Sequence, residues 1–258
     1  MDLKTQHSMN IMNLFFRSTE ALKVILKSHR GLAPFLQKGA SIASTRVLSN
    51  VRTFVPHLHS VIDAGANKGQ FALTCLHYYP EARIYSFEPV PDTFQKLSRN
   101  IQAYPHITPF HFALGSEGGS LDFYQNAHSH ASSFLPVTEL QKSIMPRTAR
   151  AHKIQVPVHT LDLWAESIRL EGPTLLKMDV QGYEKEILRG ATQTLSSVDY
   201  LLFECSFRQM HEGEPLFEDM HAFVRQLGYD LVAPVGYLES GALQIIQMDL
   251  LYKRRSSE

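Results

Sequence analysis

The sequence predicts an α/β protein with a Rossmann-like, mostly parallel and doubly wound sheet of seven strands. Strand and helix patterns alternate along most of the chain, as they do in βαβ units. The first strand ends in an acid and is followed at once by a glycine turn, and the second strand also ends in an acid. The chain has 258 residues, of which 44% are hydrophobic, so it can bury the core of one large α/β domain with an extension.

The glycine turn lies at residues 61–69, which read VIDAGANKG, and an amphipathic helix follows directly. Gly65 and Gly69 carry no Cβ, so the backbone can fold tightly and approach a ligand closely. The helix behind the turn offers unpaired N–H groups to polar ligand atoms. A dinucleotide-binding turn would have its second glycine where Asn67 stands, so that fingerprint is absent. The turn therefore indicates a nucleotide-like cofactor other than a dinucleotide.

Two acids indicate which cofactor the turn suits. Asp63 stands two residues before Gly65, where an acid suits a ligand with a free ammonium group, and S-adenosylmethionine has such a group. Glu88 ends the second strand, where its carboxylate can accept hydrogen bonds from both ribose hydroxyls. Asn67 is expected either to cap the helix or to contact the carboxylate end of the cofactor. The predicted cofactor contacts are Asp63, Gly65, Ala66, Asn67, Gly69 and Glu88, with Ala113, Leu114 and Ser116 near the adenine.

The remaining elements follow from hydrophobic patterning. Each expected strand is a short apolar run, and each expected helix repeats apolar residues every three to four positions. Pro91 begins the second helix, because the first helical turn needs no partner for its missing N–H. We expect strands at 59–63, 82–88, 108–113, 174–179, 200–205, 229–233 and 243–251, the last two as a hairpin. We expect helices at 69–79, 91–102, 183–194 and 216–227.

Two segments stand outside this alternation. Residues 1–55 carry apolar residues at roughly helical spacing and predict a helical extension to the main domain, which is assigned to residues 56–258. The extension is expected to dock on the sheet, to cover the cofactor as a lid, or to form a homodimer contact. An insert at about 118–164 contains an expected strand pair, 120–124 and 154–158, and long inserts of this kind often cover substrates.

Two further carboxylates lie at the strand ends, where open α/β sheets bind ligands. Asp179 ends the fourth strand, and Glu204 lies near the end of the fifth. The pair is expected either to hold Mg²⁺ or to supply a general base and a group that positions the substrate. In the structural alternative, Asp179 caps the next helix and Glu204 pairs with Lys177. His211, in the following loop, is either a general base or a solvated histidine.

The composition disfavours several classes of protein. The formal net charge is zero, so a broad nucleic-acid footprint, which needs a basic face, is not expected. No apolar run reaches the roughly 20 residues that a membrane helix requires, and no secretory signal is recognisable. Cys75 and Cys205 fall in a predicted helix and strand and are expected to be buried thiols. We therefore expect a cytoplasmic protein without a membrane span or a nucleic-acid partner.

Several strings resemble those of one family. LKMDVQGYE at 176–184 and ILRGA at 187–191 resemble the hallmark of the FkbM-type methyltransferases. The glycine turn, FEPVP at 87–91 and VPVHTLD at 156–162 resemble further motifs of that family in the same order. The resemblance, which covers about residues 55–205, implies the fold of the class I S-adenosylmethionine-dependent methyltransferases. It also implies methylation of a hydroxyl group on a sugar, polyketide or related small molecule.

Two other functions stay open at this point. A non-catalytic module that binds S-adenosylmethionine would carry the same turn and acids. A nicotinamide-dependent oxidoreductase would share the fold, but the glycine missing at Asn67 counts against it.

Overall fold

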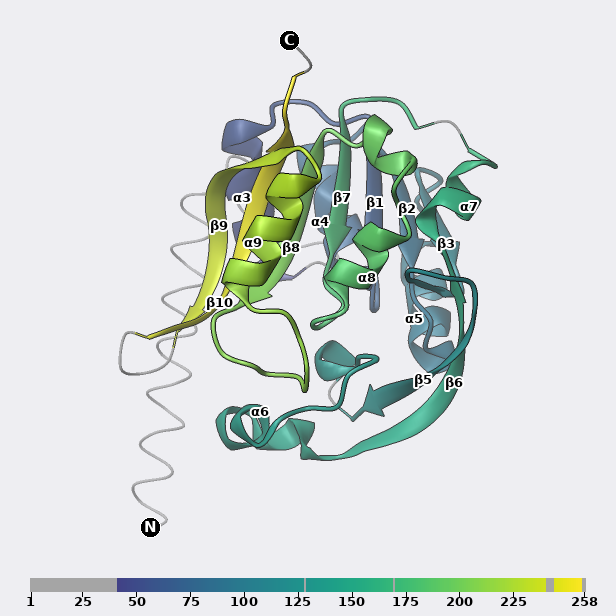
Figure 1. Cartoon of the computed structure of the whole chain (residues 1–258). Helices are drawn as coiled ribbons and strands as arrows, with labels where there is room; N and C mark the ends of the chain where they lie inside the picture. Colours follow the sequence, from purple (N-terminus) through teal and green to yellow (C-terminus); the bar gives the residue numbers. More distant parts are fainter. Residues whose placement is uncertain (1–40, 128, 169, 240–243, 257–258) are drawn as a thin grey trace, which may run out of the picture.

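The structure is a computed structural model that describes residues 41–127, 129–168, 170–239 and 244–256. Across these residues, seven strands form one sheet in the order β3-β2-β1-β7-β8-β10-β9 (Figure 1). Strands β3, β2, β1, β7 and β8 run parallel, and β10 is antiparallel to both of its neighbours. The predicted Rossmann-like, mostly parallel seven-stranded fold is therefore confirmed.

Most elements lie within a few residues of their expected positions. The strands of the main sheet are β1 (Ser60–Ala64), β2 (Arg83–Phe87), β3 (Ile107–Phe110), β7 (Thr174–Met178), β8 (Tyr200–Ser206), β9 (Tyr229–Glu239) and β10 (Ile245–Arg254). The described α-helices are α3 (Ile42–Phe54), α4 (Gln70–Tyr78), α5 (Pro91–Ile101), α6 (Glu139–Ile144), α7 (Leu161–Ala165), α8 (Glu184–Arg189) and α9 (Phe217–Gln226).

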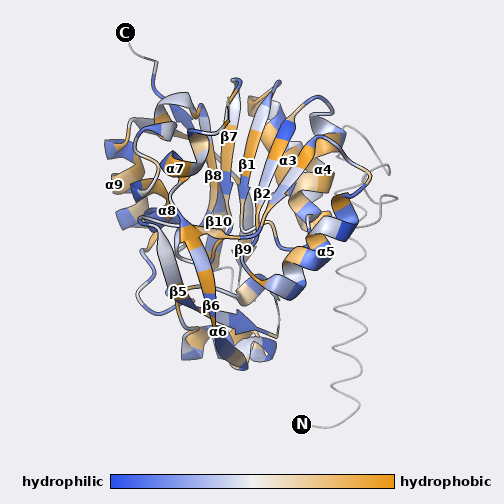
Figure 2. Cartoon of the chain, turned by 90° about the vertical axis from the view of Figure 1, so that its right-hand side faces the viewer, coloured by the Kyte–Doolittle hydropathy of each residue, from blue (hydrophilic) through white to orange (hydrophobic). Residues whose placement is uncertain are grey.

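Helices cover both faces of the sheet, and successive side chains of a strand point to opposite faces. In β1, Val61 packs in the cluster that contains α3, α4 and α5, whereas Ile62 packs with α7, α8 and α9. Leu175 and Leu176 of β7 divide in the same way, and all four side chains are fully buried. Figure 2 shows that the central strands and α4 are largely hydrophobic. Strands covered on both faces need such continuous apolar runs, which is why the sequence marks them clearly.

A second, smaller sheet lies beside the carboxyl ends of the main strands. Its described strands follow the order β4-β6-β5, with β4 (Ala113–Leu114), β5 (Gly119–Asn126) and β6 (Ala151–His159). β5 and β6 pair antiparallel, as the sequence predicts for the insert. The prediction of one strand over 108–113 is wrong at its end, because the chain leaves the main sheet after Phe110. Ala113 and Leu114 pair instead with Val158 and His159 of β6.

The closing hairpin and α8 differ in extent from the prediction. β9 and β10 are both longer than expected, and Gly236 lies within β9 opposite Asp249 rather than in the turn. α8 ends at Arg189, short of the expected residue 194. Gly190 follows as the cap and packs so closely on Gly115 that a Cβ would lie 2.0 Å from its carbonyl oxygen.

The N-terminal extension is described from residue 41 onward. The hydroxyl of Ser41 accepts a hydrogen bond from the N–H of Ser44 and so caps α3. Val47, Leu48 and Val51 of α3 belong to the core cluster that α4 also forms, so this helix docks on the sheet. The helical pattern expected before residue 41, and with it the homodimer contact, lies outside the described residues.

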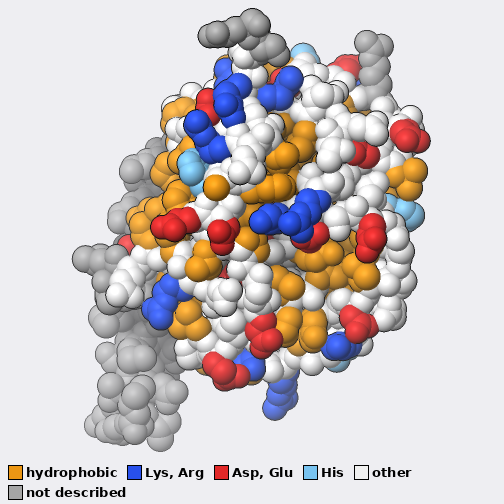
Figure 3. All heavy atoms as spheres, in the orientation of Figure 1, with side chains coloured by type: hydrophobic (Ala, Val, Ile, Leu, Met, Phe, Trp, Pro, Cys, Tyr) orange, Lys and Arg blue, Asp and Glu red, His pale blue; other side chains and the backbone are white. Residues whose placement is uncertain are grey.

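The surface has no extensive field of one charge on the face drawn in Figure 3, where basic and acidic side chains are interspersed.

No helix in the described ranges is long and apolar enough to cross a membrane. Cys75 and Cys205 are free and buried, as predicted.

The docking of α3 makes a testable difference to stability. Leu48→Ala is expected to lower the free energy of unfolding by about 2–5 kcal/mol, because it leaves a cavity where the side chain is fully buried. Ile42→Ala, in the same helix but 46% exposed, is the matched control and should change stability by no more than about 0.5 kcal/mol. Urea denaturation measures both. Equally small effects would mean that α3 is not part of the cooperative core.

Candidate functional site

A cavity of about 350 Å³ opens at the carboxyl ends of β1, β2, β7 and β8. Residues from the glycine turn, α3, the insert and β10 complete its walls. The polar side chains that give it its chemistry include Glu88, Lys177, Asp179, Gln181, Glu204 and Asp249. The cavity therefore lies at the sheet edge where the sequence places the candidate site.

The glycine turn forms the part of the cavity wall at the end of β1. Gly65 has φ +73°, and a Cβ there would lie 2.0 Å from the carbonyl oxygen of Asp179. The N–H groups of Gly65 and Ala66 both donate to the carbonyl of Phe87, which fixes the turn to β2. Gly65 and Ala66 line the cavity. Gly69, with φ +87°, stands directly before α4 and is not part of the lining.

Asp63, the expected partner of the cofactor ammonium, is not part of the lining either. Its side chain is fully buried, and Nζ of Lys177 donates to its Oδ1 at 2.7 Å. The same ammonium donates to the carbonyl oxygens of Ala64 at 3.3 Å and Gly65 at 3.1 Å. In this structure Asp63 therefore acts on the cavity through Lys177 rather than by direct contact.

Lys177 supplies a positive charge to the cavity wall. Burial lowers its pKa, but the charges of Asp63, Asp179 and Glu88 and the hydrogen bond to Asp63 outweigh this, so the pKa is raised above its usual value. A buried ammonium is tolerated when it is paired and hydrogen-bonded. The alternative in which Lys177 pairs with Glu204 is wrong, because its ion-pair partner is Asp63.

Glu88 faces the cavity with 6% of its surface exposed. The N–H of Asn67 donates to its Oε2 and the N–H of Val90 to its Oε1, both at 2.9 Å. Burial raises the pKa of Glu88 to about 7, even though both hydrogen bonds and Lys177 favour the charged form. Each carboxylate oxygen retains a lone pair for a ligand hydroxyl. This geometry suits a ribose contact.

Asn67 lines the cavity in the left-handed region, with φ +49°. Its side-chain amide donates to the Oγ of Ser129 at 3.1 Å. The alternative in which Asn67 caps α4 is wrong, because the residue at the cap position is Gly69 and no side chain caps that helix.

The predicted adenine contacts divide into two groups. Ala113 and Leu114 line the cavity from β4. Ser116 does not, because the chain has turned toward the insert, where the N–H of Gly115 donates to the carbonyl of His159.

Asp179 and Glu204 both line the cavity and are bridged by the side-chain amide of Gln181. Nε2 of Gln181 donates to Asp179 Oδ1 at 2.8 Å and to Glu204 Oε1 at 3.2 Å. Nε2 of Gln247 donates to the same Glu204 oxygen at 2.7 Å. Burial, with the charges of Asp179 and Asp249, raises the pKa of Glu204 well above its usual value. The alternative in which Asp179 caps α8 is wrong, since that helix has no side-chain cap.

The geometry does not support a magnesium site at this pair. No three His, Cys, Asp or Glu side chains in the described part of the chain are placed to hold a metal ion. The Gln181 amide nitrogen bonds both Asp179 and Glu204, and a cation would have to displace this donor.

Two charged residues of the cavity were not predicted from the sequence. Asp249 of β10 stands opposite Glu204 in the antiparallel register, and burial raises its pKa to about 6. Arg46 of α3 also lines the cavity, donates to the carbonyl of Tyr237 at 3.1 Å and counteracts the shift at Asp249. For Asp249, the sequence offered only an acid within the last expected strand. Nothing in the neighbouring residues shows that β10 runs beside β8.

His211 does not line the cavity, so the prediction that it acts as a general base is wrong. Its side chain is fully buried, and the backbone of His211 forms an isolated β-bridge with Val137 of the insert. Burial lowers the pKa of His211 to about 4, so the imidazole is neutral at neutral pH. The alternative of a solvated histidine is wrong as well, since His211 is fully buried.

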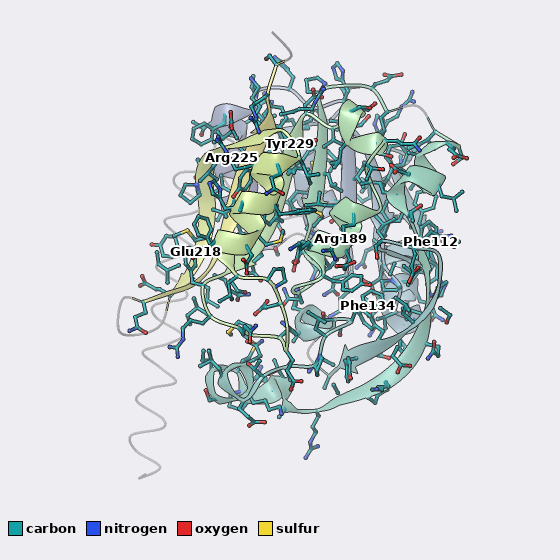
Figure 4. All side chains as sticks on the ribbon, in the orientation of Figure 1. Phe112, Phe134, Arg189, Glu218, Arg225 and Tyr229 are labelled. Atoms are coloured by element: carbon teal, nitrogen blue, oxygen red, sulfur yellow. The ribbon has the colours of Figure 1, made fainter. Side chains whose placement is uncertain are left out.

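The aromatic side chains of the insert close one side of the cavity. Phe123 and Phe134 both line it, with ring centroids 5.0 Å apart in an edge-to-face contact. Phe134, labelled in Figure 4, also packs 4.4 Å from the ring of Tyr183, so the insert touches the start of α8. Trp164, by contrast, is core, with its ring 4.9 Å from that of Phe87.

Comparisons with known proteins agree with this fold. Residues 63–231 match the family described as "Methyltransferase FkbM domain". The chain is 28% identical over 166 residues to the 2-O-methyltransferase NoeI of Sinorhizobium fredii. This alignment covers 60% of this chain and 66% of that protein. It is 29% identical over 143 residues to the hexuronic acid methyltransferase AglP of Haloferax volcanii, which covers 55% and 54%. The chain thus spans about half to two thirds of these relatives.

The solved structures to which this chain is similar include the magnesium protoporphyrin IX methyltransferase of Synechocystis PCC 6803 with bound S-adenosylmethionine. It aligns with a TM-score of 0.47 and 12% identity, over 83% of this chain and 78% of that one.

Removal of the ammonium from the buried ion pair should be costly. Lys177→Met is expected to lower the free energy of unfolding by about 3–5 kcal/mol, because it leaves the Asp63 carboxylate buried without a partner. Adding Asp63→Asn should recover part of the loss. Lys153→Met, which breaks the exposed pair with Asp122, is the control and should leave stability unchanged. Chemical denaturation of the wild type and these three variants checks this, and equal stability of the two single lysine variants would contradict it.

Proposed function

We propose that this chain, which belongs to the FkbM methyltransferase family, transfers the methyl group of S-adenosylmethionine to a hydroxyl oxygen of a small molecule. The observation that carries the proposal is the arrangement of the cavity at the strand ends. Glu88 lies on one side, with both oxygens oriented by backbone N–H groups, and Asp179 and Glu204 lie on the other.

The residues present fit the cofactor. The cavity of about 350 Å³ is large enough for a nucleoside, and the positive φ of Gly65 lets the backbone form its wall. Glu88 would hold the ribose hydroxyls, and Ala113 and Leu114 would flank the adenine. Asn67 and the glycine turn would face the methionine end, with Asp63 acting through Lys177. When bound, S-adenosylmethionine supplies a methyl group already activated by its sulfonium.

The protein's own contribution is then to orient the acceptor and to receive its proton. Gln181 fixes the Asp179 carboxylate, which accepts the proton of the acceptor hydroxyl. Glu204, whose pKa is raised by burial and by the charges of Asp179 and Asp249, lies beside this base and is placed to hydrogen-bond the acceptor. Most of the rate enhancement comes from holding two reactants in line, because the donor is already reactive. His211 takes no part, since it lies outside the cavity.

The acceptor is proposed to be a sugar or a related polyhydroxylated compound. The names of two relatives, a 2-O-methyltransferase and a hexuronic acid methyltransferase, support a sugar-type hydroxyl. The side chains at this end of the cavity support it as well, because carboxylates and amides hydrogen-bond to several hydroxyls at once. A panel of hexoses, hexuronic acids and simple alcohols with a tritium-labelled methyl donor tests this.

A non-catalytic S-adenosylmethionine-binding module is the competing function. Both functions require binding of S-adenosylhomocysteine, the demethylated product, and only the enzyme transfers label to an acceptor. Binding of NAD in place of S-adenosylhomocysteine would overturn both and favour an oxidoreductase.

The affinity for S-adenosylhomocysteine should depend on pH through Glu88. Its pKa of about 7 means that the carboxyl is protonated below neutrality and accepts ribose hydroxyls best when ionised above it. Affinity should therefore rise between pH 6 and pH 8, by at most about tenfold per pH unit. Glu88→Gln should flatten this dependence in calorimetric titrations, whereas Glu81→Gln, at an exposed site, should preserve it. The same pH dependence in Glu88→Gln would remove Glu88 from the cofactor site.

Asp179 should matter for turnover more than for cofactor binding. Asp179→Asn is expected to lower kcat about 100-fold or more, the usual loss when a general base is removed. Its affinity for S-adenosylhomocysteine should change far less. Addition of EDTA should leave wild-type turnover unchanged, because the described carboxylates are held by amides rather than arranged around a cation. A turnover that EDTA abolishes and Mg²⁺ restores would favour the metal hypothesis.

A further inference from the structure

A second cavity, of about 320 Å³, lies between the main domain and the insert. One wall comes from the glycine turn and the first turns of α5, and the other from the end of β5 and the start of β6. Thr93, Ser129 and Ser132 line both this cavity and the cofactor cavity. The two cavities are therefore neighbours that share a hydroxyl-bearing wall.

The second cavity is basic in a chain whose formal net charge is zero. Lys68, Lys96 and Arg150 line it, against the single acid Asp92. None of the three cations forms an ion pair with a described carboxylate, whereas Lys153, in the strand β6 that follows Arg150, pairs with Asp122. Among the described lining residues, the three cations thus outnumber the one acid.

Both walls are held in place by backbone hydrogen bonds. On the main-domain side, the N–H of Lys68 donates to Gln70 and its carbonyl accepts from Asn100 at 2.9 Å. On the insert side, the N–H of Ala127 donates to the carbonyl of Arg150 at 3.2 Å. The cations therefore project from positioned backbone rather than from loose loops.

We propose that this cavity binds the phosphoryl group of a phosphorylated small molecule. Three cations around one cavity suit a dianion, and a guanidinium binds phosphate oxygens in a bidentate manner. The hydroxyls of Thr93, Ser129 and Ser132 add donors that a phosphate accepts. The cavity has room beside a bare phosphate for an organic part of the ligand. Binding here does not depend on methyl transfer in the neighbouring cavity.

The test is calorimetric titration of the full chain with inorganic phosphate and with glucose 6-phosphate, at constant ionic strength. Saturable binding at one site is expected, tighter for the sugar phosphate because its organic part uses the remaining volume. Lys96→Gln with Arg150→Gln should weaken binding at least tenfold. Lys153→Gln, in β6 close to Arg150 but outside the lining, is the matched control and should leave binding unchanged.

The outcomes distinguish an organic phosphate from inorganic phosphate as the ligand. They do not depend on whether the chain transfers methyl groups. If glucose 6-phosphate binds tighter than phosphate, the site takes an organic phosphate; if the two bind equally, it takes the phosphoryl group alone. Absence of saturable binding, or equal binding by the double variant, overturns the site. The double variant should keep the wild-type affinity for S-adenosylhomocysteine, and loss of that affinity also overturns a separate anion site.

Discussion

The buried ion pair between Lys177 and Asp63 is the interaction on which the rest of the site depends. It joins the ends of the two central strands, β1 and β7, and its ammonium also bonds the carbonyl oxygens of Ala64 and Gly65. One side chain thus neutralises a carboxylate that water cannot reach and fixes the entry to the glycine turn. The same ammonium also faces a cavity with four carboxylates, Glu88, Asp179, Glu204 and Asp249. Without it, these acids would oppose one another's ionisation, and Arg46 would be the cation left in the described lining to offset them.

The fold was predictable because its signals are local. Strands covered on both faces read as continuous apolar runs, and the glycine turn marks where the first strand gives way to α4. Pro91 marks the start of α5 in the same way. Where the prediction failed, a long-range contact decided the outcome. Ala113 and Leu114 have the residue pattern of a strand end, and only their pairing with β6 takes them out of the main sheet.

The site was predictable only in part for the same reason. A sequence shows that Glu88 and Asp179 end strands, and strand ends meet at one edge of a parallel sheet. It does not show which buried charges face each other, so the pairing of Asp63 with Lys177 could not be derived from either residue's neighbours. Arg46 and Asp249 reach the cavity from opposite ends of the chain. His211 looks like a loop residue in the sequence, and its burial depends on the insert that packs over it.

The position of β10 has a consequence for how the site comes into being during synthesis. This strand is the last to leave the ribosome among those described, yet it lies inside the sheet, between β8 and β9. It carries Gln247 and Asp249 into the cavity, and Gln247 holds Glu204. A nascent chain that has not yet released β10 can form the glycine turn but has an open gap beside β8. The part of the cavity around the glycine turn and Glu88 can therefore assemble earlier during translation, whereas the part around Glu204 must wait until β10 has left the ribosome.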